Sequence, residues 1–442
     1  MEIIFKSLHS DAIPPISKEG KVIPSLRYGT RTVSFEIPPA CSYETITYMQ
    51  EQPCAGRDRS LHLIREALKA PIDSPGLREL AAGHSRAVIL VSDGTRLCPT
   101  PLLLEPLLEE LRSAGIQDDG IDIIVALGVH RKHTEEELRE LVGEAVYQRI
   151  RVYNHSALPE DCVHVGTTSH GTPVEINRRV VEAPLRIATG NIEPHALVGV
   201  SGGVKALIPG VASQSCIEHN HGLSLQYRAA IGDPDNPIHR DLEEAHAFVP
   251  IHFLLNVIVD MDRHVLDAVA GNVHSAHRTG AALASARFLH PVRKRYDLVI
   301  VSPGGDPKDR QLYQAVKALR NAAAFTKPGG PILMAAELSE GLGNGMFQYW
   351  VETISDRPRM TAKLKQHFVL GAHKILHVDE VLNSHPVYLH SSLPRHMTEL
   401  LGFHPADHLE TVLKDLSKTS PLELAVMPFG SLTFPGQPRP QA

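Results

Sequence analysis

The sequence has few cysteines and no long apolar run, and both absences narrow the classes of protein that it can encode. Its five cysteines are odd in number and include no Cys-x-x-Cys pair, which argues against a disulfide framework and against a structural zinc site. No apolar stretch is long enough to cross a bilayer, and the first residues, MEIIFKSLHSD, lack the cationic start and long apolar core of a secretory signal. We therefore expect a reduced, cytoplasmic protein.

Clusters of positive charge and familiar nucleotide or zinc motifs are absent as well. The formal net charge is −6 and the Lys and Arg residues are spread along the chain, so nucleic acid is not an expected partner. The segment VSGGVKALIPG, residues 200–210, is not a Walker A loop, because Val204 replaces the second glycine and Ala206 replaces the serine or threonine. It is not a Rossmann fingerprint either, and the chain has no His-Glu-x-x-His motif.

Histidine, in contrast, is abundant. The chain has 26 histidines against 11 phenylalanines and a single tryptophan. We expect most of these histidines to be surface or structural residues. Such a supply of imidazole nevertheless favours metal or acid–base chemistry in the molecule.

Short β-rich runs alternate with helical runs along most of the chain, a pattern typical of parallel α/β sheets. The expected strands cover residues 86–92, 121–127, 185–190, 252–260, 297–303, 331–337 and 423–428. The expected helices include residues 101–115, 133–143 and 309–323. Thr134 and Glu137 predict a capping box at the start of the second of these helices.

A chain of 442 residues is longer than one hydrophobic core usually serves, so we expect two α/β domains with mostly parallel sheets. We place an N-terminal domain at residues 1–275, with the tail at about 420–442 able to pack back on it. We place a C-terminal domain at residues 295–415. A helix rich in small residues, NVHSAHRTGAALASARFLHP, is expected to join the two.

Four of the expected strands end in polar turns that contain glycine. These turns cover residues 93–96, 128–131, 190–195 and 303–306. Ligands of open α/β sheets bind outside the carboxyl ends of the strands. We therefore expect the four turns to converge on one cleft.

Several residues in these segments have both a functional and a structural interpretation. Asp93 either caps the next helix, with Arg96 exposed, or acts with Arg96 on an anionic ligand. Lys205 is either a solvated lysine after an ordinary turn or an amine held beside a ligand that the paired glycines allow to approach. The structural interpretation of His130 is that it belongs to the turn that leads into the next helix.

Two further groups are ambiguous when taken alone. His219 and His221 form a His-x-His pair, and we expect one of them to face the cleft while the other does not. Gln314 and Lys317 are three residues apart on one helix face, with Tyr313 adjacent. By itself this second group is an ordinary solvated face.

Taken together, these segments resemble the nickel-dependent lactate racemase family. The resemblance rests on SDGTRLCP, ALGVHRKHTEEEL, GNIEPHALVGVSGGVKALIPG, the Asn-His pair at 220–221 and GGDPKDRQLYQAVKAL. Their order and spacing fit across about residues 90–320, and the match is looser at the N-terminus and through 340–442. The sequence departs from the family in placing Leu97 and Cys98 between the motif arginine and Pro99.

The resemblance implies a racemase or epimerase of a 2-hydroxy acid, with its active site in the cleft between two α/β domains. It implies inversion at C2 by reversible hydride transfer, through a 2-oxo acid, to nickel held in pyridinium-3-thioamide-5-thiocarboxylic acid mononucleotide, a nickel-pincer nucleotide. The cofactor residues that it implies are Lys205 as the covalent tether, His221 as the nickel ligand, and Asp93, Thr95, Gly202 and Gly203. The implied catalytic residues are His130, His195 and Arg96, and the implied substrate-binding residues are Tyr313, Gln314, Lys317 and Arg96.

The sequence leaves the substrate, the oligomeric state and the second-domain residue that covers the cofactor undecided. Tyr349 and Trp350 are candidates for the cover. One alternative is a Schiff-base enzyme that uses Lys205 on a carbonyl acid. Another is a non-catalytic nickel- or nucleotide-binding protein, although storage would not need the acid–base pair His130 and His195. The expected partners are a small 2-hydroxy acid and the enzymes that make and load the cofactor.

Overall fold

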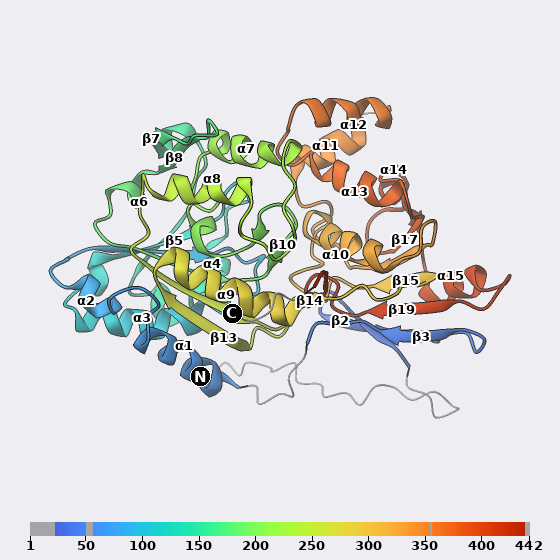
Figure 1. Ribbon diagram of the computed structural model, residues 1–442, viewed down its shortest axis with the longest axis horizontal. Coiled ribbons are helices and arrows are strands. Elements are labelled where there is room, and N and C mark those ends of the chain that lie inside the picture. The colour runs from blue at the N-terminus through green and yellow to red at the C-terminus, as the bar shows by residue number, and fades with distance from the viewer. Residues whose placement is uncertain (1–22, 50–55, 354–355, 438–442) are drawn as a thin grey trace.

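The computed structural model describes residues 23–49, 56–353 and 356–437, which form two α/β halves built on two six-stranded sheets (Figure 1). The N-terminal segment in which no secretory signal is expected and the last residues of the tail lie outside the described ranges. Cys54 also lies outside them, and the other four cysteines are free thiols. Within these ranges, no helix combines the length and apolar character that a membrane span needs.

The first sheet has the strand order β13-β12-β9-β4-β5-β6. Its strands are β4 (Ala87–Ser92), β5 (Ile121–Ala126), β6 (Arg151–Asn154), β9 (Arg186–Asn191), β12 (Phe253–Val259) and β13 (Val265–Gly271). Neighbouring strands are parallel except for the edge strand β13, which runs antiparallel to β12. β12 is buried along its whole length, as a strand inside a sheet covered on both faces should be. The four strands predicted for this half are confirmed to within one residue.

The second sheet has the order β18-β17-β16-β15-β19-β3, and all of its pairs are parallel. Its strands are β3 (Ser42–Thr45), β15 (Leu298–Val301), β16 (Ile332–Ala335), β17 (Val387–His390), β18 (His404–Pro405) and β19 (Glu423–Met427). The three strands predicted here are confirmed, although β15 and β16 are shorter than expected.

Short strand pairs and helices complete both halves. The pairs are β1 (Ser25–Tyr28) with β2 (Arg31–Ser34), β7 (Cys162–Thr167) with β8 (Pro173–Asn177), β10 (Pro194–His195) with β11 (Gly199–Val200), and β14 (Leu289–His290) with β20 (Phe434–Pro435). The helices before the junction are α1 (Arg57–Lys69), α2 (Leu77–Ala81), α3 (Thr100–Ser113), α4 (Glu135–Val142), α5 (Glu144–Tyr147), α6 (Arg178–Glu182), α7 (Gln214–Gly222) and α8 (Pro237–His246). The remaining helices are α9 (Val273–Phe288), α10 (Leu312–Phe325), α11 (Gly345–Thr353), α12 (Arg357–Gln366), α13 (Lys374–Leu382), α14 (Arg395–Leu400) and α15 (Leu409–Leu416). The predicted capping box forms at the start of α4.

The two sheets divide the chain differently from the expected ranges 1–275 and 295–415. β3 lies near the start of the chain but pairs with β19 in the second sheet, so both ends of the chain contribute to the second half. The sequence of β3, SYET, is exposed throughout, and a polar edge strand carries no apolar pattern that would reveal its sheet. After β19 the tail returns, because β20 pairs with β14 and Phe434 packs in the first core.

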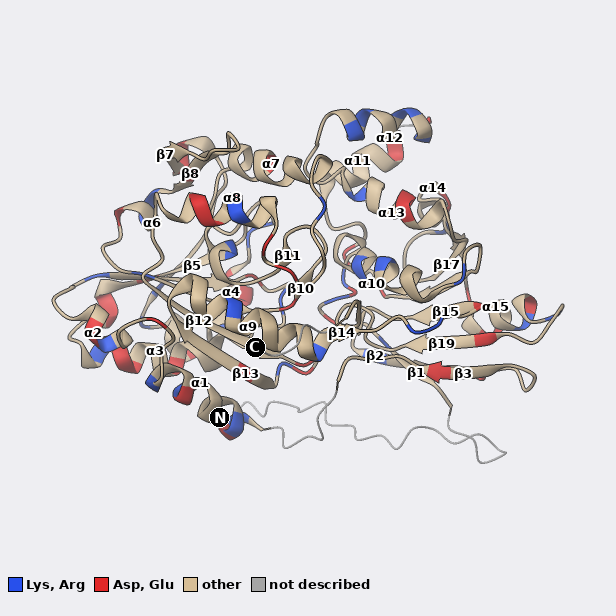
Figure 2. Ribbon diagram, in the orientation of Figure 1, with Lys and Arg blue, Asp and Glu red and all other residues tan. Residues whose placement is uncertain are grey.

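Charge is mixed over both halves. In the view of Figure 2, positive and negative residues are interspersed along the helices and strands on either side of the junction. This distribution agrees with the spread of Lys and Arg along the sequence.

Candidate active site

A cavity of about 500 Å³ lies between the two halves and brings most of the predicted site residues together. The first half contributes residues that follow β4, β5 and β9 and the segment around Lys205, whereas the second half contributes α10 and α13. The predicted residues that line the cavity are Asp93, Arg96, His130, His195, Gly202, Gly203, Lys205, His221, Tyr313, Gln314 and Lys317.

Three of the four predicted turns contribute to this cavity. The fourth turn, residues 303–306 after β15, does not line it, so the expectation that all four converge is wrong at this point. The backbone N–H of Asp306 instead donates to the carbonyl of Gly29 at 3.0 Å, which packs the turn against the β1–β2 hairpin. Lys308, just beyond the turn, reaches back to Glu193 of the first half.

Asp93 organises the end of β4. One of its carboxylate oxygens lies 3.2 Å from His130 Nδ1 and 3.8 Å from Arg96 Nε, and the other accepts from the backbone N–H of Thr95 at 2.7 Å and from the Thr95 hydroxyl. Burial alone would raise the pKa of Asp93, but His130, Arg96 and Thr95 together hold it well below its ordinary value. The carboxylate therefore orders the His130 ring, whose Nε2 remains as a proton acceptor. Thr95 does not line the cavity but positions Asp93.

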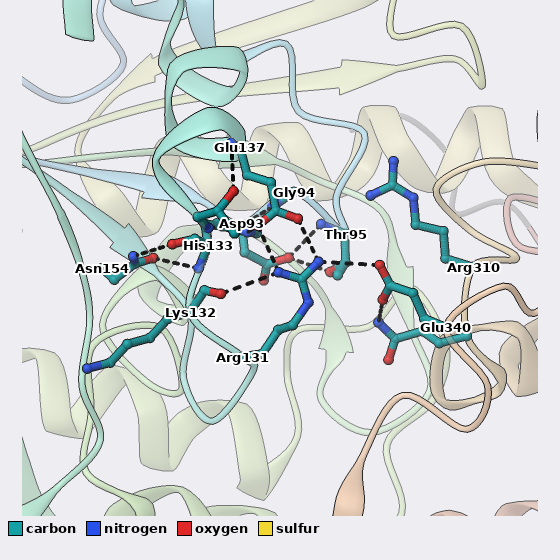
Figure 3. A network of polar contacts seen from close by, with 12 residues as sticks. Asp93, Gly94, Thr95, Arg131, Lys132, His133, Glu137, Asn154, Arg310 and Glu340 are labelled. Carbon is teal, nitrogen blue, oxygen red and sulfur yellow. Dashed lines mark hydrogen bonds and ion pairs between the residues drawn. The ribbon is translucent and has the colours of Figure 1, made fainter.

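A hydrogen-bond network fixes the turns that carry Asp93 and His130 (Figure 3). The backbone N–H of Gly94 donates to His133 Nε2 at 3.0 Å. The Asn154 side chain, at the end of β6, accepts from the His133 backbone N–H at 3.0 Å and donates to its carbonyl at 2.8 Å. The ends of three neighbouring strands are thereby tied together, which fixes the acid–base groups before a ligand binds.

His195, in β10, is held by backbone groups. Its Nδ1 accepts from the backbone N–H of Leu197 at 3.1 Å and of Val198 at 3.4 Å, so the neutral ring carries its proton on Nε2. Burial lowers the pKa of His195 well below its ordinary value, and the charges of Lys205 and Lys317 lower it further. The two predicted acid–base histidines thus differ, because His130 has a proton acceptor available and His195 a donor.

Lys205 lies half-buried in the cavity wall, in a short 3-10 turn over Gly203–Ala206. Burial lowers the pKa of its amine well below the ordinary value, and the charges of Arg96 and Lys317 add to this effect. An uncharged amine is the nucleophilic form of lysine. The structural alternative of a fully solvated lysine therefore does not apply.

The two glycines before Lys205 are required by what lies behind them. Gly202 and Gly203 have φ angles of 80° and 58°. An added Cβ would lie 2.7 Å from Asn256 Oδ1 at Gly202 and 2.7 Å from the His277 ring at Gly203. Glycine therefore lets this loop pack closely against β12 and α9, with its bare backbone towards the cavity.

His221, near the end of α7, lines the cavity, and its Nδ1 is a buried polar atom without a hydrogen-bond partner. His219 points elsewhere, with its Nε2 at 3.0 Å from the His170 carbonyl oxygen. The prediction that one histidine of this pair faces the cleft while the other does not is confirmed. Burial lowers the pKa of His221 to about 3, and Lys205 and Lys374 add to the shift. A neutral imidazole is the state that metal coordination requires.

Tyr313, Gln314 and Lys317 enter the cavity from α10. Gln314 is buried, and Tyr313 and Lys317 are half-buried. The interpretation of this group as an ordinary solvated face is therefore wrong. Burial lowers the pKa of Lys317 well below its ordinary value, and the charge of Arg96 lowers it further.

The structure adds three cavity residues that the sequence analysis did not single out. His373, Lys374 and His377, at the start of α13, line the cavity. Burial lowers the pKa of Lys374 to about 7, and Arg320 contributes next. These three residues have the same spacing as Tyr313, Gln314 and Lys317. That repeated spacing is the signal in the sequence that could have pointed to them.

The two candidates for a cofactor cover do not line the cavity. Trp350 packs in the core of the second half, and Tyr349 is exposed on α11. The α13 residues occupy the second-half wall instead, where His373 stacks on Phe368 with ring centroids 4.9 Å apart.

The residues present fit the implied nickel nucleotide. His221 is a cavity histidine whose buried Nδ1 has no hydrogen-bond partner, and the two clusters of His and acidic residues that could hold a metal among the described residues lie outside the cavity. These clusters are His170–Asp241–Glu244 and Asp260–Asp262–His264. No group of three His, Cys, Asp or Glu ligands among the described residues lines the cavity, so a nickel ion at His221 would take ligands from the nucleotide, whose sulfur and carbon donors suit Ni(II).

The fold and the cavity define a class, an α/β enzyme whose active site lies between two halves. The chain matches the family described as "Lactate racemase N-terminal domain" over residues 28–232 and "Lactate racemase C-terminal domain" over residues 292–428. It therefore belongs to the lactate racemase family and is an isomerase.

Characterised relatives and solved structures agree with this assignment. The chain is 36% identical over 66% of its length to lactate racemase from Thermoanaerobacterium thermosaccharolyticum, covering 70% of that protein. It is 32% identical over 75% of its length to lactate racemase from Lactiplantibacillus plantarum, covering 78% of that protein. The lactate racemase apoprotein structure from T. thermosaccharolyticum matches with a TM-score of 0.83 and 29% identity, over 94% of this chain and all of that one. A Thermotoga maritima structure, 19% identical with a TM-score of 0.65 over 88% of this chain and 99% of that one, shares the fold.

Proposed function

We propose that the protein inverts C2 of a 2-hydroxy acid, using a nickel-pincer nucleotide tethered at Lys205. The observation that carries this proposal is the convergence of Lys205, His221 and the two acid–base histidines on one interdomain cavity. The names of the relatives support lactate or a similar acid as substrate. The reaction is expected to take place in the cytoplasm, with separate enzymes making and loading the cofactor.

His130 is the group prepared to remove the substrate hydroxyl proton. Its Nδ1 is oriented by Asp93, so its Nε2 accepts the proton and the resulting imidazolium is stabilised by the carboxylate. His195 serves the opposite hand of the substrate. To accept a proton at Nε2, it must first transfer its own proton to Nδ1 and release the backbone N–H groups of Leu197 and Val198.

The α10 residues hold the carboxylate while C2 inverts. Gln314 and Lys317 supply an amide and an ammonium donor to the carboxylate, and a planar 2-oxo acid held at this end can be approached from either face. When bound, the nucleotide would supply the hydride-acceptor chemistry that inversion at C2 needs. Lys205 and His221 would hold that group in place, and Arg96 would steady the substrate hydroxyl.

The decisive measurement is the intact mass and nickel content of protein produced together with the cofactor-making enzymes. The wild-type chain should carry an added mass and about one nickel ion per chain, and Lys205→Ala should lose the added mass. His221→Ala should keep the mass and lose most of the nickel. An unmodified wild-type chain from cells that load a known relative would contradict the proposal.

An isotope experiment tests the route of the C2 hydrogen. A single enantiomer is racemised in deuterated water, and direct return of the hydrogen predicts little deuterium at C2. Full exchange at C2 would instead indicate a carbanion and would contradict the proposal.

A Schiff-base enzyme is the second candidate, because burial favours the uncharged amine of Lys205. Borohydride added with a 2-oxo acid would then join the acid to the chain irreversibly. In cofactor-loaded protein the proposed tether predicts no such adduct, since the Lys205 nitrogen is already part of a thioamide.

A further inference from the structure

Lys374 is a buried lysine that the proposed reaction does not use. It is 7% exposed and lines the cavity from α13. Its Nζ lies 4.5 Å from the centroid of the Tyr313 ring, and no carboxylate within the described ranges forms an ion pair with it. Burying an ammonium without an anion is costly, and a cation–π contact offsets only part of that cost.

The acidic groups near the cavity are already paired. Asp93 is shared by His130 and Arg96. Glu193 is bound by Lys308, with nitrogen–oxygen distances of 3.0 and 3.2 Å. Neither carboxylate is therefore left to neutralise a further cation.

Three cavity lysines, Lys205, Lys317 and Lys374, remain without an ion-pair partner among the described residues, and Lys205 is the proposed tether. Arg320 is matched by Glu380 at 2.8 Å, whereas Lys317 and Lys374 have no carboxylate at ion-pair distance among the described residues. A single substrate carboxylate at Lys317 leaves Lys374 without an anion. With both lysines protonated, the cavity therefore holds one more positive charge than a monocarboxylate neutralises.

The position of Lys374 places this extra charge at the substrate end of the cavity. The Tyr313 ring beneath its Nζ belongs to the proposed carboxylate-binding group and meets the His130 ring edge-on, with centroids 6.2 Å apart. His377, one turn farther along α13, also lines the cavity and adds a hydrogen-bonding imidazole. A nucleotide phosphate is separated from its reactive ring by a ribose, so an anion beside Tyr313 and His130 is better matched by the substrate.

We propose that Lys374, assisted by His377, binds a second carboxylate of the substrate, so that the preferred substrate is a short 2-hydroxy dicarboxylic acid. This inference rests on the proposed function for its reaction, but the binding of a diacid does not require the cofactor. The C1 carboxylate occupies Gln314 and Lys317, and the far carboxylate occupies the α13 wall.

The first test compares two acids of equal chain length on the loaded enzyme. 2-Hydroxybutanedioate should be racemised with a kcat/KM about 10- to 100-fold above that of 2-hydroxybutanoate, the range expected for a charge-assisted hydrogen bond. Lys374→Met should bring the two acids within about threefold, and Lys374→Arg should restore part of the preference. Lys365→Met, an exposed change on α12, is the matched control and should leave the preference intact.

The second test measures binding without turnover. Titration calorimetry on cofactor-free protein should show the diacid binding about 10-fold more tightly than the monoacid, with the difference lost in Lys374→Met. If no acid is racemised but this difference is seen, the proposed function fails and the second anion site stands. If Lys374→Met keeps the diacid preference, or if the wild-type protein binds and turns over both acids equally, the proposal is overturned.

Mass and nickel content separate the substrate from the nucleotide phosphate. Lys374→Met protein should carry the same added mass and nickel as the wild type. Loss of both, together with an unchanged ratio of diacid to monoacid binding, would assign Lys374 to the phosphate and overturn the proposal. A circular dichroism melt of each variant confirms that the protein is folded.

Discussion

The two halves of the molecule build the same cavity in different ways. The first half supplies side chains at the ends of parallel strands, and backbone or carboxylate groups hold both of its acid–base histidines in fixed orientations. The second half supplies side chains from the faces of α10 and α13, where Lys317 and Lys374 have no carboxylate partner among the described residues. We therefore expect the first half to set the acid–base chemistry and the second half to select the anionic substrate.

Two of the ion pairs between the halves differ sharply in burial. Glu193 and Lys308 meet in the interior, where their side chains are 4% and 6% exposed. Arg131 and Glu340 meet at the surface, 3.3 Å apart (Figure 3). The same kind of contact should therefore differ widely in its effect on stability.

The largest expected effect comes from removing the prepared base of the first half. His130→Gln keeps a side-chain donor for Asp93 but provides no basic nitrogen, so kcat for racemisation should fall by about 10²–10⁴ with little change in KM. Lys317→Met, the matched change in the second half, should act mainly through KM. Nickel content and added mass should be unchanged in both variants. A His130→Gln enzyme with kcat within threefold of the wild type would contradict the proposal that the first half supplies the acid–base chemistry.

The next effect tests the buried link between the halves. Lys308→Met leaves the Glu193 carboxylate buried without its main partner and should lower the free energy of unfolding by about 3–5 kcal/mol. The double variant with Glu193→Gln should recover a large part of this loss, because it removes the stranded charge. Denaturant unfolding of the two single variants and the double variant gives the coupling directly. Additive losses would show that the two side chains do not act as a pair.

The third prediction concerns acid sensitivity in the first half. His155 is buried, with Nε2 2.9 Å from the Ala212 carbonyl oxygen and Nδ1 3.2 Å from Asn177 Nδ2, so both nitrogens are used by the neutral ring. Burial lowers the pKa of His155 to about 4. Between pH 6.5 and 4 the unfolded chain takes up a proton that the folded protein does not, so stability should fall as the pH is lowered, by up to about 3 kcal/mol from this group.

The measurement for this third prediction is the free energy of unfolding from pH 7 to pH 4. His155→Gln should reduce the loss of stability across that interval, even if it is less stable at neutral pH. His367→Gln, an exposed change in the second half, is the control and should leave the pH dependence as in the wild type. An unchanged slope in His155→Gln would show that protonation of this histidine does not contribute.

The sequence predicts the first half better than the second for a physical reason. Buried parallel strands such as β4 and β12 are continuous apolar runs, and the polar turns that follow them stand out by contrast. Asp93, His130 and His195 could therefore be located before the structure was known. The polar edge strand β3 has no such pattern, and only its pairing with β19 reveals its sheet.

Residues on helix faces are harder to recognise in a sequence. Lys374 and His377 look like any polar helical residues, and their importance depends on how α13 packs beside α10 at the cavity. Tyr313, Gln314 and Lys317 were singled out, but only a family resemblance gave them a role. The turn at 303–306 shows the opposite failure, because a glycine-rich turn after a strand packs against the β1–β2 hairpin instead of the cavity.

The smallest expected effect tests the surface link between the halves. Arg131 is 54% exposed in its side chain and already forms two hydrogen bonds with Glu137, at 2.8 and 2.6 Å, so the contact with Glu340 adds little order. Glu340→Gln should change the free energy of unfolding by less than about 1 kcal/mol, and the difference should shrink further at high salt because exposed charges are screened. Denaturant unfolding at low and high salt checks this. Because His130 precedes Arg131 and is held separately by Asp93, kcat should also stay within about twofold of the wild type. A loss as large as that of Lys308→Met would mean that the surface pair, and not the buried one, holds the two halves of the cavity together.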